Sequence, residues 1–194
     1  MNTPSHAILN LTFLGHTAYP RSNLLIVIGA IVPDLPIFLF YAWAKLIVQL
    51  PENIIWTEAY YSPWVQDIVA VCHSIPLALL GWLIGFCFKW SGLQLFCLSL
   101  VFHSLLDLPV HHDDAHRHFF PLSNYRLISP ISYWDPRHYG GIVAFLEMVF
   151  VLLATVRNFE TVQSPIGRGA MIGVNLFYGL GYYLLYSSNN STHF

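Results

Sequence analysis

Long apolar runs separated by short polar breaks dominate the chain, and their lengths predict helices. Residues 68–88 contain no Asp, Glu, Lys or Arg, and this run is long enough for one membrane-spanning helix. Four further apolar segments are similar: residues 22–50, 93–110, 139–156 and 169–187. No segment alternates apolar and polar residues as a membrane β-strand does. The pattern predicts an all-α, polytopic membrane helical bundle with four to five transmembrane helices.

Two predicted elements differ from a simple span. Residues 5–18 can form a helix, but at about 1.5 Å per residue it is too short to cross a bilayer, so we expect it to be interfacial or half inserted. Inside residues 22–50, Pro33 and Pro36 flank Asp34 and interrupt the helical hydrogen bonds. We therefore expect two half-helices that meet at Asp34. Its carboxylate either lines a cavity or caps the second half-helix.

Two polar segments connect the spans. Residues 51–67 are predicted to be a loop whose aromatic side chains form an interfacial belt. Residues 111–138 form a longer polar loop, and loops of more than about a dozen residues are usually functional or disordered. Because this loop is rich in Tyr, Phe, Trp and Pro, we expect it to be ordered and to fold over a site. The alternative for its His-rich part is a solvated surface loop.

The composition places the chain in a membrane. Only 9% of its 194 residues are charged, against about 25% in soluble proteins, and 56% are hydrophobic. We therefore expect a single integral membrane domain, residues 1–194, with membrane lipid around it. The net charge of -2 argues against nucleic acid as a partner. Ten histidines outnumber eight Lys plus Arg, which favours metal or proton chemistry.

Histidines and aspartates concentrate at the end of one predicted span. The sixteen residues from His103 to His118 contain five histidines and three aspartates. Such groups are costly beside lipid, so their clustering indicates a functional site. His103 and Asp107 are four residues apart and share one helical face, where they present nitrogen and oxygen ligands suited to zinc and similar ions. The alternative is a His–Asp packing pair.

Other polar residues extend this candidate metal site. Asp34 and His73 are intramembrane candidates for the same centre, and a histidine just past the helix end can complete it. His73 on its own can also be a hydrogen-bonded packing residue. The donors allow one metal with an open position or two metals, and an open position lowers the pKa of bound water to about 7. The candidate ligands are His6, Asp34, His73, His103, Asp107, His111 and His112.

Further residues are candidates for chemistry around the metal. Asp107, His112 and His116 are the candidate catalytic residues, the two histidines by completing the metal shell or moving protons. Arg117 and Arg126 are candidates to hold a phosphate oxygen of the substrate. Glu147 lies inside the predicted span 139–156, where it can be a ligand, a base or a hydrogen-bonded core residue.

Several motifs in the first 125 residues resemble one family. They are Ser5-His6-Ala7, Gly29 to Leu35 with its Pro33-Asp34 pair, Cys72-His73-Ser74, Phe102 to Asp107, and Phe119 to Leu122. These motifs are similar to those of bacterial inner-membrane, metal-dependent hydrolase-like proteins of the YdjM type. The His-x-x-x-Asp element more distantly resembles the helical zinc phospholipases C. The resemblance implies a helical inner-membrane protein with His6, Asp34, His73, His103 and Asp107 as metal ligands.

The chain also departs from that family pattern. Pro36 stands where the family often has a second acid, and Ala70-Val71-Cys72 stands where it often has His-Arg-Gly. At both positions the chain therefore lacks side chains that the family offers to a second metal ion.

These observations together predict a membrane-embedded, metal-dependent hydrolase of a lipid or phosphoester. The metal is a divalent cation, with zinc expected first and manganese or iron as alternatives, and the substrate is a small molecule or a lipid. The alternative is a non-catalytic metal-handling or structural membrane protein.

Overall fold

The computed structural model describes residues 1–18 and 20–187, and all regular secondary structure within them is helical. Short 3-10 and π-helical turns supplement the α-helices. The α-helices are α1 (Thr3–Leu14), α2 (Pro20–Ile31), α3 (Leu35–Ala42), α4 (Glu52–Thr57), α5 (Pro63–Cys72), α6 (Ile75–Cys87), α7 (Ser91–Asp107), α8 (Gly140–Asn158) and α9 (Pro165–Tyr182). The predicted all-α class is confirmed for this part of the chain.

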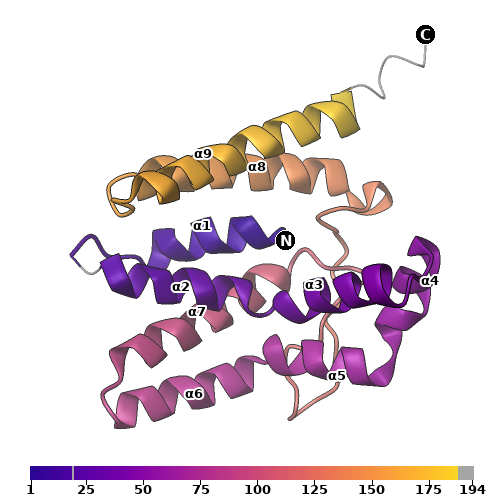
Figure 1. Cartoon of the computed structure of the whole chain (residues 1–194), viewed down its shortest axis with the longest axis horizontal. Helices are drawn as coiled ribbons and strands as arrows, with labels where there is room; N and C mark the ends of the chain where they lie inside the picture. The colour runs from indigo at the N-terminus through magenta and orange to yellow at the C-terminus, as the bar shows by residue number, and fades with distance from the viewer. Residues whose placement is uncertain (19, 188–194) are drawn as a thin grey trace.

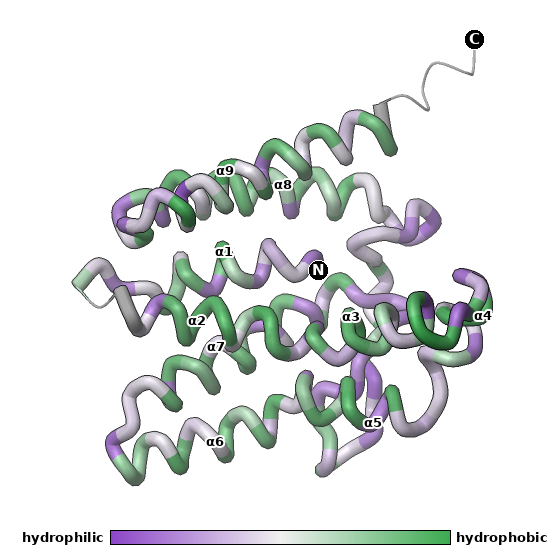
Figure 2. Tube along the Cα trace, viewed as in Figure 1, coloured by the Kyte–Doolittle hydropathy of each residue, from purple (hydrophilic) through white to green (hydrophobic). Residues whose placement is uncertain are grey.

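The long helices pack side by side in a row. Neighbouring pairs are α6 with α7, α7 with α2, α2 with α1, α1 with α8, and α8 with α9 (Figure 1). Helix α1 therefore lies between α2 and α8, and the N-terminus lies in the middle of the molecule. Hydrophobic residues cover much of the helices, whereas hydrophilic residues gather near the N-terminus and along the loop after α7 (Figure 2). This arrangement brings the polar groups of several helices together.

The predicted break at Asp34 is present. Helix α2 ends at Ile31 and α3 begins at Leu35, and the two apolar helices meet at an angle of 55°. Pro33 has no N–H, and the N–H of Asp34 donates to Ile31, so neither residue donates to the carbonyl of Ala30. The break therefore leaves the carbonyl of Ala30 without a backbone donor.

A second break divides the segment predicted as the span 68–88. Helix α5 ends at Cys72, and α6 begins at Ile75 with Ser74 as its N-cap, whose side chain accepts from the N–H of Leu77. Pro76 suits the first turn of α6, so the chain can restart its helix here. His73 lies in the break. The segment 51–67, predicted as a loop, is mostly helical, because α4, a 3-10 turn and the start of α5 occupy it.

Two helices in the described residues are long and apolar enough to cross a membrane, namely Pro63–Cys87, counted through its break, and Gly140–Asn158. The bent pair Ser22–Ile31 and Leu35–Ile47 makes a third if it counts as one span. The segments predicted as spans 93–110 and 169–187 are helical as α7 and α9, but neither is among these candidates. Helix α7 has 17 residues, which is short for a span.

The long loop 111–138 contains one short 3-10 turn, Pro136–His138, and folds back onto the helices. The N–H of Ile75 donates to the carbonyl of His118 at 2.9 Å, and the hydroxyl of Ser74 donates to the carbonyl of Phe120. The loop therefore packs against the break between α5 and α6. His111, His116 and His118 are buried by this docking, which excludes the alternative of a fully solvated loop.

Candidate metal centre

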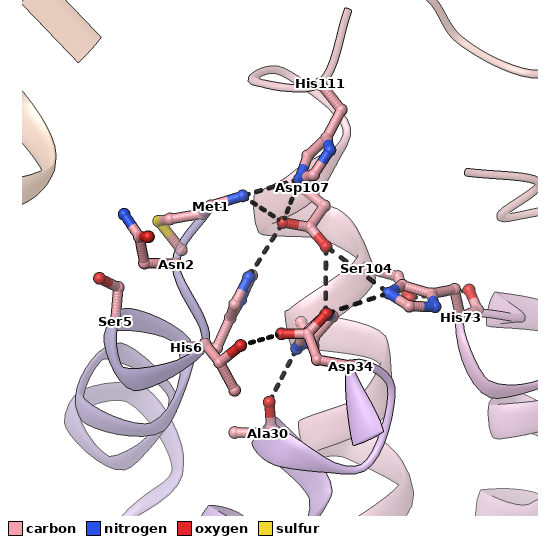
Figure 3. A network of polar contacts seen from close by, with 12 residues as sticks. Met1, Asn2, Ser5, His6, Ala30, Asp34, His73, Ser104, Asp107 and His111 are labelled. Carbon is pink, nitrogen blue, oxygen red and sulfur yellow. Dashed lines mark hydrogen bonds and ion pairs between the residues drawn. The ribbon is translucent and has the colours of Figure 1, made fainter. Parts of the chain in front are cut away.

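Four buried side chains from three parts of the chain converge at the two helix breaks. Nε2 of His103 lies 3.1 Å from Oδ2 of Asp107 and 3.5 Å from Oδ1 of Asp34. Nε2 of His73 lies 3.5 Å from the same Asp34 oxygen and 4.0 Å from Oδ2 of Asp107. One ligand atom from each residue lies within 4.8 Å of the others, so this group can hold a metal ion. Figure 3 shows Asp34, His73 and Asp107 pointing toward one another.

The tautomers of both histidines follow from their backbone partners. Nδ1 of His103 lies 2.8 Å from the carbonyl of Ala30, and Nδ1 of His73 lies 2.9 Å from the carbonyl of Val69. A carbonyl oxygen only accepts, so in each ring Nδ1 carries the proton. In a neutral ring, Nε2 then presents a lone pair toward the two carboxylates. This is the second-shell arrangement typical of metal-bound histidine.

The free nitrogens give the best test of whether a cation fits. Nε2 of His73 and Nε2 of His103 are buried and form no hydrogen bond, although carboxylate oxygens lie close by. Buried polar atoms without partners are costly, and lone pairs that face carboxylates repel one another. A divalent cation between them resolves both costs. A simple His103–Asp107 packing pair would engage Nε2 of His103 only if that ring carried a second proton, and it would still leave Nε2 of His73 without a partner.

Asp34 occupies the N-cap position of α3, but its side chain makes no capping hydrogen bond. Instead, Oδ2 accepts a hydrogen bond of 2.5 Å from the hydroxyl of Thr3 on α1, which leaves Oδ1 facing the two histidines. The carboxylate is therefore oriented for the site, and capping does not explain it.

Asp107 also belongs to a second group, formed with His111 and His116 from the loop. Its Oδ1 lies 3.1 Å from Nε2 of His111 and 2.9 Å from Nε2 of His6, while Oδ2 faces the first group. The amino group of Met1 lies 2.7 Å from Oδ1 and 2.8 Å from Nε2 of His111 (Figure 3). Oδ1 of Asp107 is therefore engaged with the second group, while Oδ2 remains with the first.

His6 lies beside the four converging ligands rather than among them. Its ring stacks on the ring of His103 at a centroid distance of 3.7 Å, and its Nε2 hydrogen bonds with Asp107. These contacts hold both partners in place. The family resemblance implied that His6 is a metal ligand. Its geometry also suits a residue that holds the ligands in position without binding the ion.

Burial and neighbouring charges shift the pKa values of the loop histidines. Burial, reinforced by the nearby His73, lowers the pKa of His118 to about 4. Burial and His73 also hold the pKa of His116 well below its usual value. For His111, burial lowers the pKa, but the carboxylates of Asp107 and Asp114 outweigh it and raise the pKa. At neutral pH two of the three rings are therefore neutral.

A cavity of about 880 Å³ opens beside the centre. Asp34, His111 and His116 line the end nearest the candidate ligands, and Thr3 lies on the same wall. The remaining wall is largely aromatic. Such a cavity gives a small molecule or a lipid head group access to the buried carboxylates and imidazoles.

The structure places His112 away from both groups, even though it follows His111 directly. Its Nδ1 lies 2.5 Å from the carbonyl of Ser129, and its ring stacks on His138 at 3.7 Å. The two candidate substrate arginines are also bound elsewhere. Arg117 donates to Asp67 at 2.6 Å, and Arg126 donates to Gln66 at 2.8 Å. Neither arginine lines the cavity, so their contacts hold the loop against α5.

Glu147 lies outside both groups as well. Its Oε1 accepts from the backbone and side chain of Asn2 and from the hydroxyl of Ser5, so it fixes the start of α1. Of the three interpretations that the sequence left open, these contacts fit the hydrogen-bonded core residue. The sequence also gave no signal for Thr3, whose hydroxyl orients Asp34. Asp114 follows His111 by three residues, and that spacing was the only clue to their contact.

The chain matches no family model, and comparison with curated proteins and with solved structures found no match. The function must therefore be argued from the site itself.

Proposed function

We propose that this chain is a membrane-embedded, metal-dependent hydrolase that acts on a lipid or phosphoester at the membrane surface. The observation that carries the proposal is the pair of buried Nε2 atoms, on His73 and His103, that form no hydrogen bond and face two carboxylates. Asp34, His73, His103 and Asp107 would hold the ion. Nitrogen and carboxylate oxygen ligands suit zinc first, with manganese or iron as alternatives.

The surface of the molecule supports a membrane setting. Large apolar side chains are widely exposed, among them Leu46 at 74%, Leu176 at 70% and Phe177 at 70%. Water would disfavour so many exposed apolar groups, whereas lipid would not. We therefore propose an integral membrane protein, with α7 and α9 embedded beside the candidate spans and the bacterial inner membrane as its location.

The motifs that resemble the YdjM-type family also support the proposal. They are far apart in the sequence, yet His6, Asp34, His73, His103 and Asp107 lie in one cluster. Such convergence is expected if the motifs serve one site. We therefore propose membership of that family, with lipid as the surrounding medium and no role for nucleic acid.

The residues around the cavity would have different chemical roles. A bound divalent ion acts as a Lewis acid and makes a water molecule a stronger acid. His111 lines the cavity with one ring nitrogen 3.1 Å from Asp107 and the other 3.0 Å from Asp114, and these carboxylates favour its protonated form, which would serve as the acid toward a leaving group. His116, on the same wall, can accept a proton. His112 has no role in this proposed chemistry, because its contacts keep it outside the cavity.

The test is metal content and turnover of the purified full chain in detergent. Elemental mass spectrometry of the wild type should find about one equivalent of divalent metal. The variants Asp107→Asn and His103→Gln should lose it, whereas the matched control His112→Gln should retain it. Loss of metal from His112→Gln alone, or no metal in the reconstituted wild type, would overturn the site.

Turnover separates the hydrolase from the metal-handling alternative. The metal-loaded wild type should hydrolyse carboxylic-ester or phosphoester lipids, and chelation should abolish the activity. Stoichiometric metal without hydrolysis of either class would favour a metal-handling protein. If the Asp107→Asn variant functions like the wild type in cells, a structural membrane protein would be favoured.

A further inference from the structure

Aromatic and acidic side chains make up most of the lining of the cavity beside the metal centre. Its aromatic side chains are Phe38, Trp56, Tyr60, Tyr61, Tyr133 and Trp134. Three carboxylates also line it, from Asp34, Asp113 and Asp114. Among the described residues around the cavity there is no Lys or Arg. An anionic substrate group would meet negative charge and aromatic faces at the outer end of this cavity.

Several rings of the aromatic wall are accessible, whereas Tyr60 is buried. Trp56 is 42% exposed, Tyr61 is 44% exposed and Trp134 is 47% exposed. Tyr60 joins the first two, because its ring centroid lies 5.7 Å from that of Trp56 and 5.2 Å from that of Tyr61. The faces of aromatic rings carry negative potential, and open faces grouped around a cavity attract cations.

No described Lys or Arg forms an ion pair with Asp113 or Asp114, although Nδ1 of His111 lies 3.0 Å from Oδ2 of Asp114. Nε1 of Trp134 donates to Oδ2 of Asp114 at 3.2 Å, which ties the aromatic wall to the acid, and Oδ1 of Asp114 forms no hydrogen bond. The guanidinium of Arg126 donates to Gln66 and to the carbonyl of Ala115 instead. Oδ1 of Asp114 and the carboxylate of Asp113 are therefore available to a ligand.

We propose that the cavity binds an alkylated ammonium group of the substrate, with the bond to be cleaved directed toward Asp34 and His111. An alkylated ammonium is weakly hydrated and can lie over several ring faces, while Asp113 and Asp114 supply the counter-charge. The position of the cleaved bond rests on the proposed hydrolase function. The cation site rests only on the cavity.

The binding test compares two ligands of nearly equal shape. Choline carries the charge, and 3,3-dimethylbutan-1-ol replaces its nitrogen with carbon. Each is titrated into the full chain in detergent after removal of metal by EDTA, with tryptophan fluorescence and calorimetry as readouts. We expect choline to bind at least about tenfold more tightly than the neutral alcohol. Inorganic phosphate should not compete with it.

Matched variants test whether choline binds to the aromatic and acidic wall of the cavity. Trp134→Leu and Asp113→Asn should each weaken choline binding by about three- to tenfold. Trp90→Leu, at an exposed tryptophan outside the cavity, and Glu160→Gln, at an exposed acid, should leave it unchanged. If Trp134→Leu does not fold, Trp56→Leu replaces it, and Asp113→Asn keeps the test decisive.

The outcomes are distinguishable from those of the hydrolase test. Equal binding of choline and the alcohol, no binding of either, or tighter binding of phosphate would overturn the cation site. Because the titration uses protein without metal and measures no turnover, an inactive protein can still bind choline. A hydrolase that does not bind choline would refute only the cation site.

Discussion

Nδ1 of His103 on α7 lies 2.8 Å from the carbonyl oxygen of Ala30 on α2. That carbonyl is available because the helix is interrupted at Pro33, where the backbone no longer donates to it. The interruption thus orients a candidate metal ligand on a different helix. Two features that look unrelated in the sequence, a proline and a histidine 70 residues later, depend on one hydrogen bond.

The first prediction concerns this break. Pro33→Ala allows the helix to continue, so that the N–H of Asp34 can compete for the Ala30 carbonyl. His103 then loses its orienting partner, and metal affinity should fall about 10- to 100-fold, as for other outer-shell partners. Metal titration with a fluorescent competitor measures the change. Pro36→Ala is the control, since Pro36 lies in the first turn of α3, where proline is tolerated. Equal effects of the two substitutions would contradict this explanation.

The second prediction concerns the hydroxyl of Thr3, which donates to Oδ2 of Asp34. Thr3→Val keeps the shape of the side chain but removes the donor. Metal affinity should fall about tenfold or more, while Thr3→Ser should retain most of it. The same competitor titration applies. If the serine and valine variants bind metal equally, the hydroxyl has no part in orienting Asp34.

The third prediction concerns the contact between α2 and α7. A Cβ on Gly29 would lie 2.6 Å from the carbonyl oxygen of Phe96 and 2.8 Å from Cβ of Ser99. Gly29→Ala therefore forces the two backbones apart and should destabilise the fold by about 1–3 kcal/mol. Thermal unfolding in detergent should show a lower midpoint.

Gly173 provides the matched control for Gly29. It lies in α9, and a Cβ there would meet no atom within 4 Å. Gly173→Ala should be neutral or stabilising by up to about 1 kcal/mol, because alanine favours the helix. Comparable midpoints for both alanine variants would show that α2 and α7 do not approach as closely as described.

The fourth prediction concerns pH. Burial and the nearby His73 lower the pKa of His118 to about 4 in the folded chain, whereas an unfolded histidine titrates near about 6.5. Between these values the unfolded chain binds more protons, so stability rises with pH across this window and is lost as pH falls from 6.5 toward 4. The contribution is on the order of 3 kcal/mol.

Unfolding of the metal-free chain at pH 5 and pH 7 tests this sign. The wild type should be less stable at the lower pH. His118→Gln, which has no proton to gain, should lose part of that difference, with the remainder coming from His116, whose pKa is also lowered. A variant with the same pH dependence as the wild type would show that His118 does not titrate in this way.

Part of this architecture could be predicted from local sequence. Apolar runs of helical length predicted the helices, Pro33 and Pro36 predicted the break at Asp34, and the four-residue spacing predicted the shared face of His103 and Asp107. These features depend on neighbours within one or two turns, where periodicity and proline chemistry decide the outcome. The break at His73 was not predicted, although Pro76, which suits the first turn of a new helix, was a local sign of it.

The loop after Asp107 shows what the sequence alone could not determine. His111 and His112 are adjacent and chemically identical, yet one faces Asp107 and the other bonds to Ser129. Arg117 and Arg126 looked suited to a substrate phosphate, but they bind residues of α5. An irregular segment has no period that assigns its side chains to a face, so only its docking on the distant α5–α6 break, through the hydrogen bond from Ile75 to His118, decided which side chains reached the site.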